Sequence, residues 1–339
     1  MNPISDSGGD SARAQRLQQD YVRTMDEIGK RIIGQRKVID QILLTLLAGG
    51  NSLLIGVPGL AKTMMIETLA EVLDLSHARI QFTPDLMPSD ITGTDLVQED
   101  PESRRRELVF HKGPVFANVV LADEINRTPP KTQAALLEAM QERRVSVQGR
   151  SYDLPQPFFV FATQNPIELE GTYPLPEAQL DRFMFNILLD YSEEEEELEI
   201  VRATTADHVP VLETIVTAQT LIEYQHLVRR VPLAEPVAAY ALALVRASRP
   251  GSAGAPDFVN RWLTYGASVR AAQYLVLGGK ARALTRGRAH VGYEDIRELA
   301  RPVLRHRLLR NFHAESEQVG VEAIIEQLLD SVARPSAAA

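Results

Sequence analysis

Short apolar runs alternate with helically spaced segments over the first half of the chain. Residues 21–49 carry apolar side chains at helical spacing, broken at Gly34, where a glycine favours a turn. Residues 64–72 and 130–142 have the same spacing. Five apolar runs have the length of buried strands, and they cover residues 52–56, 79–83, 118–124, 158–166 and part of 182–190. Strands that alternate with helices predict an α/β fold with a parallel sheet and helices on both faces.

The pattern changes near the fifth apolar run. Before it, residues 143–155 alternate apolar and polar positions around a Gln-Gly pair, which predicts a hairpin. After it, Ser192 and Glu195 have N-cap spacing, and the acidic run beside them fits the first turn of a helix, although an interaction tail is the alternative. Nearly all of the remaining chain has helical spacing, with breaks at proline and glycine. We therefore expect a second domain that is all-helical.

The size and composition of the chain agree with two soluble domains. Its 339 residues are too many for one ordinary compact core, and 45% of them are hydrophobic against 24% charged. We expect an αβα core (21–192) and a smaller helical domain (193–333). A flexible N-terminal arm (1–20) and a disordered tail (334–339) would flank them.

The charge and residue inventory excludes several kinds of function. A net charge of −9 argues against a protein that coats nucleic acid through bulk basicity. Because the chain has no cysteine, disulfides, thiolate catalysis and cysteine-bound zinc are excluded. The polar start lacks the apolar segment of a targeting leader, and no run of about 18 apolar residues predicts a membrane span. We expect a cytoplasmic protein.

The segment LLIGVPGLAKT, residues 53–63, nearly matches the phosphate-loop pattern G-x-x-x-x-G-K-[ST]. Lys62 would reach the β- and γ-phosphates of a nucleotide, and the Thr63 hydroxyl would hold Mg²⁺. Ala61 stands where the pattern has a glycine, so we expect no strongly left-handed backbone there. An ordinary strand-to-helix turn is the alternative. The nucleotide-binding residues predicted here are Gly56, Val57, Pro58, Gly59, Leu60, Ala61, Lys62, Thr63 and Met64.

A second motif, which is acidic, follows the third predicted strand. The apolar run of NVVLADEINR ends in Asp123 and Glu124, and the carboxyl end of a strand is where open α/β sheets bind ligands. Asp123 would contact Mg²⁺, and Glu124 would polarise the attacking water. Taken alone, the pair is also compatible with a solvated loop. The seven histidines are scattered without ligand spacing, so no further metal site is predicted.

The GVPGLAKT and LADEINR stretches resemble the MoxR family of AAA+ ATPases, over about residues 24–333. RIQFTPDLMPSDITGTDL (79–96) is similar to the helix-2 insert of that family. The segment that includes PPKTQAALLEAMQERRV and the hairpin, and the motifs ATQNP, PLPEAQLDRFMF and GASVRAAQYL, also match. The family commonly carries alanine before the lysine. The resemblance implies an AAA+ P-loop αβα core, a helical lid domain, and ATP with Mg²⁺ as cofactors.

The resemblance also implies roles for residues outside the two loops. Asn165 resembles sensor 1, Arg182 the arginine finger and Arg270 sensor 2, although Val269 replaces the usual proline before Arg270. From the residues alone, Asn165 also fits a capped turn and Arg182 a surface ion pair. It is open whether Arg270 acts on the nucleotide of its own subunit or of a neighbour.

Other residues are expected to contact the base or a neighbouring subunit. Ile33 and Gly34, with Gln35, resemble the adenine-contact segment, with a plain helix–helix turn as the alternative. Arg127 and Gln133 would line a subunit interface or, more simply, cap or solvate a helix.

The resemblance implies a homo-oligomeric ring, with a hexamer as the expected stoichiometry. Its ATP hydrolysis would drive chaperone-like remodelling or activation of a protein client, with a partner that carries a von Willebrand factor A domain. The alternatives are a nucleic-acid motor, a metal-chelatase motor subunit and a non-enzymatic nucleotide-binding scaffold. The expected client contacts are the insert (84–112) and the hairpin (143–155). The hairpin has arginines but no aromatic residue beyond Tyr152 to stack on a base, which disfavours nucleic acid.

Overall fold

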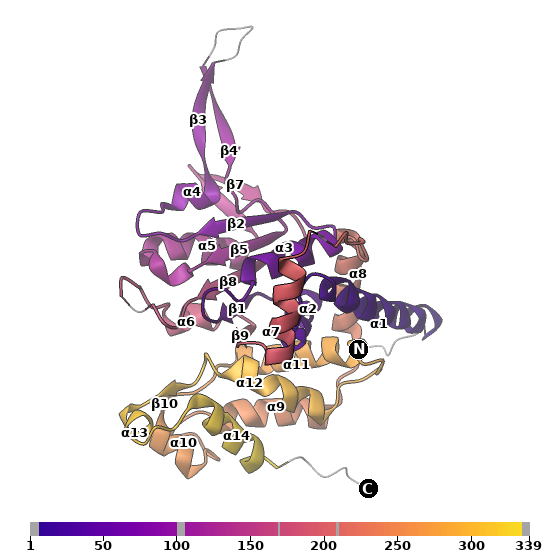
Figure 1. Cartoon of the computed structure of the whole chain (residues 1–339). Helices are drawn as coiled ribbons and strands as arrows, with labels where there is room; N and C mark the ends of the chain where they lie inside the picture. Colours follow the sequence, from indigo (N-terminus) through magenta and orange to yellow (C-terminus); the bar gives the residue numbers. More distant parts are fainter. Residues whose placement is uncertain (1–6, 100–105, 169, 208–209, 334–339) are drawn as a thin grey trace.

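A parallel five-stranded sheet forms the centre of the computed structural model, which describes residues 7–99, 106–168, 170–207 and 210–333 (Figure 1). The strand order is β2-β5-β8-β1-β9, and every neighbouring pair is parallel. The strands are β1 (Ser52–Ile55), β2 (His77–Gln81), β5 (Val119–Asp123), β8 (Phe159–Gln164) and β9 (Phe185–Leu188). All five predicted strands are confirmed.

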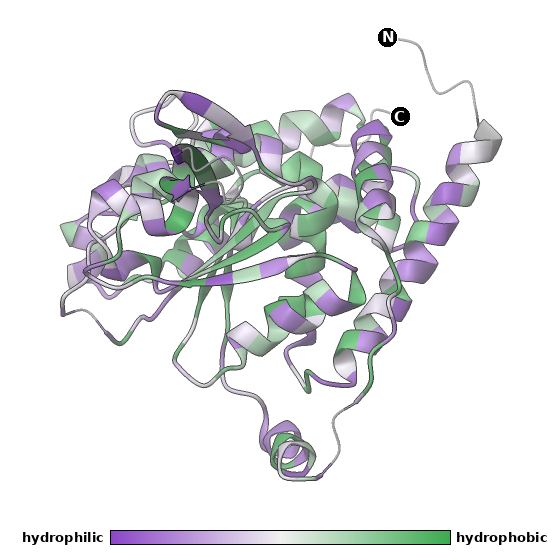
Figure 2. Cartoon of the chain, turned by 90° about the horizontal axis from the view of Figure 1, so that it is seen from above, coloured by the Kyte–Doolittle hydropathy of each residue, from purple (hydrophilic) through white to green (hydrophobic). Residues whose placement is uncertain are grey.

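Alternate residues of the inner strands enter two separate hydrophobic clusters. Leu54 and Phe161 pack with the helices of one face, α1 (Ser7–Gly29), α2 (Arg36–Ala48) and α3 (Lys62–Val72). Leu53 and Ala162 pack on the other face with α5 (Pro130–Glu142). Figure 2 shows most of the central strands as hydrophobic, between helices of mixed character. The predicted αβα core is confirmed.

The N-terminal arm expected over residues 1–20 is wrong for the part that the structure describes. Residues 7–20 belong to α1, and residues 1–6 lie outside the described ranges. Leu17 is 1% exposed and Ile28 is fully buried, and the buried carboxylate of Asp20 accepts a hydrogen bond from the Tyr224 hydroxyl at 2.6 Å. One apolar residue per helical turn is enough to dock a helix on a ready-made surface, and the polar majority of this segment hides that stripe.

Helices dominate the second domain, and they share a hydrophobic cluster with α1 and α2. Its elements are α7 (Glu194–Thr204), α8 (Ala218–Arg230), α9 (Glu235–Ala247), α10 (Asp257–Trp262), α11 (Val269–Thr285), α12 (Tyr293–Leu304), α13 (Phe312–Ser316) and α14 (Val321–Ser331). The predicted helical lid is confirmed, with one addition. A short antiparallel pair, β10 (Leu263–Tyr265) and β11 (Leu309–Arg310), lies within it.

The first helix of the lid begins slightly later than its sequence indicates. The N-cap of α7 is Glu193 and not Ser192, and no side chain caps the helix. The acidic first turn is present, because residues 194–197 are all glutamate. Carboxylates near a helix N-terminus offset the positive end of its dipole, which takes the place of a capping hydroxyl.

Two antiparallel hairpins extend the core beyond the sheet. β6 (Arg144–Val147) and β7 (Arg150–Asp153) form the predicted hairpin around Gln148 and Gly149, both at positive φ. The insert contains α4 (Pro88–Thr92), β3 (Gly93–Glu99) and β4 (Arg106–Lys112), and its hairpin projects at the top of Figure 1. Phe110 of β4 stacks on Tyr152 of β7, with ring centroids 4.0 Å apart. The β3–β4 hairpin of the insert and the β6–β7 hairpin therefore contact each other.

Within the described part of the chain, no helix has both the length and the apolar character needed to cross a bilayer.

Leu17→Ala tests whether α1 is part of the folded core. Loss of a fully buried leucine side chain should lower the free energy of unfolding by about 2–5 kcal/mol. Val22→Ala is the matched control on the same helix, because Val22 is 49% exposed, and it should change stability by at most about 0.5 kcal/mol. Urea unfolding measures both. Equal, small effects would mean that α1 does not pack as described.

Candidate nucleotide site

The loop between β1 and α3 is shaped by two glycines and a close neighbour. A side chain at Gly56 would place its Cβ 2.8 Å from the Cβ of Leu189 and 2.9 Å from its carbonyl oxygen, so only glycine fits. Gly59 has φ +88°, a conformation that glycine adopts without steric cost, and a Cβ there would meet no atom within 4 Å. The loop is therefore pressed against the end of β9 on one side and open on the other.

Ala61 contradicts the expectation drawn from its sequence. Its φ of 53° and ψ of 25° lie in the left-handed region, and it is the N-cap of α3 rather than the first helical residue. The chain must reverse direction between a buried strand and a buried helix, and that constraint outweighs the local preference of alanine. The left-handed residue leaves the first N–H groups of α3 directed out of the helix end, where an anionic group would be bound.

Lys62 lies across this loop. Its ammonium donates a hydrogen bond to the carbonyl oxygen of Gly56 at 2.6 Å. Burial lowers the pKa of Lys62, while the charges of Asp123 and Glu124 act in the opposite direction. A cation that is partly desolvated at a helix N-terminus is well placed to exchange one carbonyl contact for phosphate oxygens.

Asp123 ends β5 and is held on both carboxylate oxygens. Its Oδ1 accepts from the Thr163 hydroxyl at 2.6 Å, and its Oδ2 accepts from Arg79 Nη2 at 2.6 Å. Thr163 lies on the neighbouring strand β8 and is fully buried, and its hydroxyl oxygen also accepts from the Glu124 backbone N–H at 2.8 Å. One threonine therefore fixes the positions of both acidic residues.

Glu124 has a strained backbone and a side chain held by two donors. Its φ of 56° and ψ of 48° place it in the left-handed region, where residues other than glycine cost free energy. Its Oε2 accepts from Gln81 Nε2 at 3.1 Å and from Arg127 Nη1 at 3.2 Å. The side chain is thus directed toward β2, the strand at one side of the sheet.

Asn165 follows β8 at the same edge of the sheet. It is 6% exposed, and its Oδ1 accepts from the backbone N–H of Ile167 at 3.1 Å. Its Nδ2 is buried and has no hydrogen-bond partner among the described residues. A buried donor without a partner is costly, and a bound polar group at this edge would satisfy it.

The segment expected to contact the base lies beside the phosphate loop. Gly34 has φ +69°, and a Cβ there would lie 2.6 Å from Glu196 Oε2. Gln35 Nε2 donates to the carbonyl oxygen of Asp190 at 2.7 Å, next to the Leu189 that contacts Gly56. Gly34, Gln35 and the loop thus meet around the residues that follow β9.

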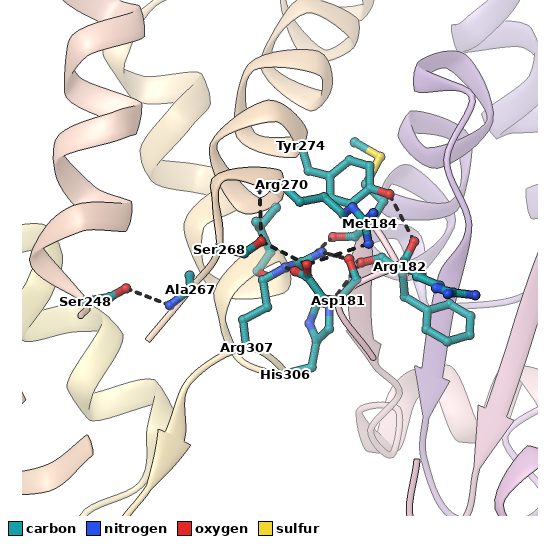
Figure 3. Close-up of polar contacts among 12 residues, drawn as sticks. Asp181, Arg182, Met184, Ser248, Ala267, Ser268, Arg270, Tyr274, His306 and Arg307 are labelled. Atoms are coloured by element: carbon teal, nitrogen blue, oxygen red, sulfur yellow. Dashed lines mark hydrogen bonds and ion pairs between the residues drawn. The ribbon is translucent and has the colours of Figure 1, made fainter. Parts of the chain in front are cut away.

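Arg182 and Arg270 lie together, at a different edge. The Tyr274 hydroxyl donates to the Arg182 carbonyl oxygen at 3.0 Å, and Arg270 Nη1 is 3.7 Å from Asp181 Oδ2. Figure 3 shows Asp181 at the centre of this cluster, where it also accepts from Ser268 Oγ at 2.9 Å. The Arg182 guanidinium donates to the carbonyl oxygen of Leu137 on α5 at 3.1 Å.

Arg307 joins this cluster to the lid and is 7% exposed. Its Nε donates to Asp181 Oδ1 at 2.7 Å, and its Nη2 donates to the carbonyl oxygens of Asp181 at 2.8 Å and Phe183 at 2.7 Å. Burial lowers the pKa of Arg307, and its pairing with Asp181 opposes this change. Such a buried arginine, with several acceptors satisfied, fixes the lid against the start of β9.

The two groups of residues lie at opposite ends of the parallel strands. The Met184 N–H donates to the carbonyl oxygen of Asn51, just before β1 begins, whereas the Gly56 N–H bonds to Gln164, where β8 ends. The five residue steps from Asn51 to Gly56 span about 16 Å. Arg182, two residues before Met184, is therefore at the amino end of the strands. The phosphate loop and the acidic pair are at the carboxyl end.

Several residues that hold these groups in place carry no recognisable signal in the sequence. Arg79 and Gln81 lie on the same face of β2, and Thr163 lies on β8, so their partners depend on strand register. Gln133 is fully buried and donates to the carbonyl oxygens of Ile125, Thr128 and Tyr173, so the suggestion that it lines a subunit interface is wrong.

Ala61→Gly tests the left-handed start of α3. Glycine adopts this conformation without the cost of about 1–2 kcal/mol that an L side chain incurs, so the free energy of unfolding should rise, by up to about 1 kcal/mol after the flexibility of unfolded glycine is counted. Ala134→Gly, within α5, is the matched control and should lower it by about 1 kcal/mol. Thermal unfolding compares them. Equal losses in both would show that residue 61 is right-handed.

Comparison with known proteins agrees with this geometry. The ATPase family associated with various cellular activities (AAA) matches residues 51–185, and the AAA lid domain matches residues 259–328. Chaperone MoxR1 of Mycobacterium tuberculosis is 43% identical over 314 residues, which is 92% of this chain and 82% of the relative. Protein MoxR of Paracoccus denitrificans is 30% identical over 316 residues, which is 88% of this chain and 91% of the relative.

A solved structure with the same fold also matches this chain. A crystal structure of a proposed ATPase from Cytophaga hutchinsonii superposes with a TM-score of 0.88 at 42% identity, covering 96% of this chain and 98% of that one. The phosphate loop, the acidic pair and the sheet order fall inside the matched region. The chain therefore belongs to the MoxR family of AAA+ ATPases.

Proposed function

We propose that this chain is a cytoplasmic ATPase that works as a homo-oligomeric ring, expected to be a hexamer. The observation that carries the proposal is the separation of two sets of residues along the parallel strands. The phosphate loop and the acidic pair share one edge of the sheet, and Arg182 and Arg270 lie together at the other. A complete site then forms between neighbouring subunits arranged head to tail.

ATP would bind at the edge that holds the phosphate loop. Lys62 and the N–H groups at the start of α3 supply donors for phosphate oxygens, and Ile33 and Gly34 would line the base site. Thr63 and Asp123 would hold Mg²⁺, which offsets the phosphate charge when bound. Within the described residues, no group of three or more His, Asp or Glu side chains could hold a metal ion by itself. The metal would therefore arrive with the nucleotide.

Glu124 and Asn165 are the proposed groups that act on the attacking water. A carboxylate held by Gln81 and Arg127 is fixed in one orientation and can accept a proton from a water at the sheet edge. The unpartnered Asn165 Nδ2 would orient that water or contact the γ-phosphate. Lys62 and these two residues therefore complete the share of the site that one subunit supplies.

Arg182 and Arg270 would reach the nucleotide of the adjacent subunit. Both arginines are partly exposed, and their backbones are fixed by Tyr274 and by the pairing of Asp181 with Arg307. An arginine that enters from a neighbour stabilises charge in the transition state of phosphoryl transfer. We propose that both arginines act in trans.

We propose that hydrolysis remodels or activates a protein complex. The relative from M. tuberculosis is named a chaperone, and the MoxR resemblance is the basis for a partner with a von Willebrand factor A domain. A protein client would contact the insert (84–112) and the hairpin (143–155). The nucleic-acid motor loses support because the Tyr152 ring already stacks on Phe110. Among the described residues, no feature favours the chelatase or scaffold alternatives.

The test is ATP turnover per subunit measured against protein concentration. Turnover should rise with concentration as shared sites assemble. Glu124→Gln and Arg182→Ala should each lower kcat by about 10³-fold or more, with Glu124→Gln still binding ATP. Arg246→Ala, a substitution of an exposed arginine on α9, is the control and should leave turnover unchanged. Turnover that is independent of both concentration and Arg182 would contradict the shared site.

Thr163→Val tests the support of the acidic pair. Valine removes the hydroxyl that bonds both Asp123 and the Glu124 N–H, so kcat should fall by about 10²-fold while KM for ATP changes little. Thr45→Val is matched, because Thr45 is also fully buried and hydrogen-bonded, to Gln41 and Ser52. It should lose similar stability without losing kcat. If both variants keep kcat, Thr163 does not position the acids.

A further inference from the structure

Helix α7 is attached to the rest of the chain by a narrow contact. None of its residues is buried, and only Glu196 and Ile200, one turn apart, are partly covered. Leu198 and Val201 are 51% and 57% exposed. They share a helix face with Glu194 and Glu197, one turn earlier. An eleven-residue helix is marginal in water without a packed apolar face, so this surface calls for a partner.

The position of α7 identifies the edge of the subunit on which this surface lies. Glu196 approaches Gly34, and Ser192 lies beside it, next to the proposed base site. The helix begins six residues after β9 ends, at the carboxyl end of the strands. It therefore lies at the edge that binds the nucleotide.

A complementary surface lies at the opposite edge. The outer face of α11 carries Val269, Ala272 and Val276 at helical spacing, and Val269 is 58% exposed. Ala272 and Val276 line a shallow hollow of about 590 Å³, which Arg229 and Arg270 flank. Tyr274 of the same hollow bonds to Arg182, so the hollow is continuous with the proposed arginine edge.

We propose that α7 of one subunit docks in the α11 hollow of the next subunit. Leu198 and Val201 would pack on Ala272 and Val276, with the glutamates of α7 near Arg229. An amphipathic helix in an apolar groove is a common mode of recognition, and opposite charges at the rim fix its orientation. This inference rests on the proposed ring and names the element that joins its subunits.

The geometry of the two surfaces fits this contact. α7 has eleven residues and is about 16 Å long, and the stripe from Val269 to Val276 is about 10 Å long. Because the surfaces differ and lie at opposite edges, the contact is head to tail, as a ring requires. The same contact would bring Arg182 toward the nucleotide edge of the adjacent subunit.

The absence of cysteine from the chain makes cross-linking a clean test. Leu198→Cys subunits are mixed with Val276→Cys subunits, oxidised under ATP, and separated without reductant. A disulfide-linked dimer should form at least about tenfold faster than in a mixture of Val211→Cys with Val276→Cys, because the docked thiols have a high effective concentration. Val211 is the control, since it is 87% exposed but lies outside α7.

Charge exchange tests the rim of the contact. Glu197→Arg and Arg229→Glu, each added singly to the cysteine pair, should slow the cross-link several-fold, and together they should restore it. If oligomers and turnover are intact while the Leu198→Cys pair cross-links no faster than the control, the docking inference is wrong and the ring proposal stands. If no oligomer forms at any concentration, both are wrong.

Discussion

The parallel direction of all five strands is the constraint on which the rest of this structure depends. In a parallel sheet the carboxyl ends meet at one edge and the amino ends at the other. Gly56, Asp123 and Asn165 therefore come together, although they are far apart in the sequence. The same constraint places Arg182 at the start of β9, one strand length away. A single chain cannot close that distance without losing the sheet.

Asp181 and Arg307 connect this constraint to the lid. Arg307 is buried at the junction and Asp181 is partly buried, and Arg307 also holds backbone carbonyl oxygens at the start of β9. Removing one partner from such a pair leaves a charge that is costly to bury, so the contact strongly favours one arrangement of lid and core. Gly278 lies so close to Met184 and Phe185 that an added Cβ would meet both, which allows α11 to pack against the sheet. These contacts therefore hold Arg270 of the lid beside Arg182 of the core.

The sequence predicts β1, β5, β8 and β9 well because most of their residues are buried and read as continuous apolar runs. It also selects the loop at residues 53–63 and the Asp123–Glu124 pair, which the structure brings to the same edge of the sheet, since both patterns depend on neighbours in the chain. It does not reveal Thr163 or Arg79, because their contacts to Asp123 depend on strand register. The predictions for Ala61 and for the segment around Leu17 are wrong for related reasons. A tertiary requirement sets the backbone of one, and a sparse apolar stripe within polar sequence buries the other.

A subunit-mixing experiment tests the central claim that each site is shared. Glu124→Gln and Arg182→Ala subunits, each inactive alone, are combined in equal amounts and assembled. In a random head-to-tail ring about one quarter of interfaces pair an intact Glu124 with an intact Arg182, so turnover should return to about one quarter of the wild-type value per subunit. Mixtures that form rings but stay as inactive as either variant alone would contradict the shared site.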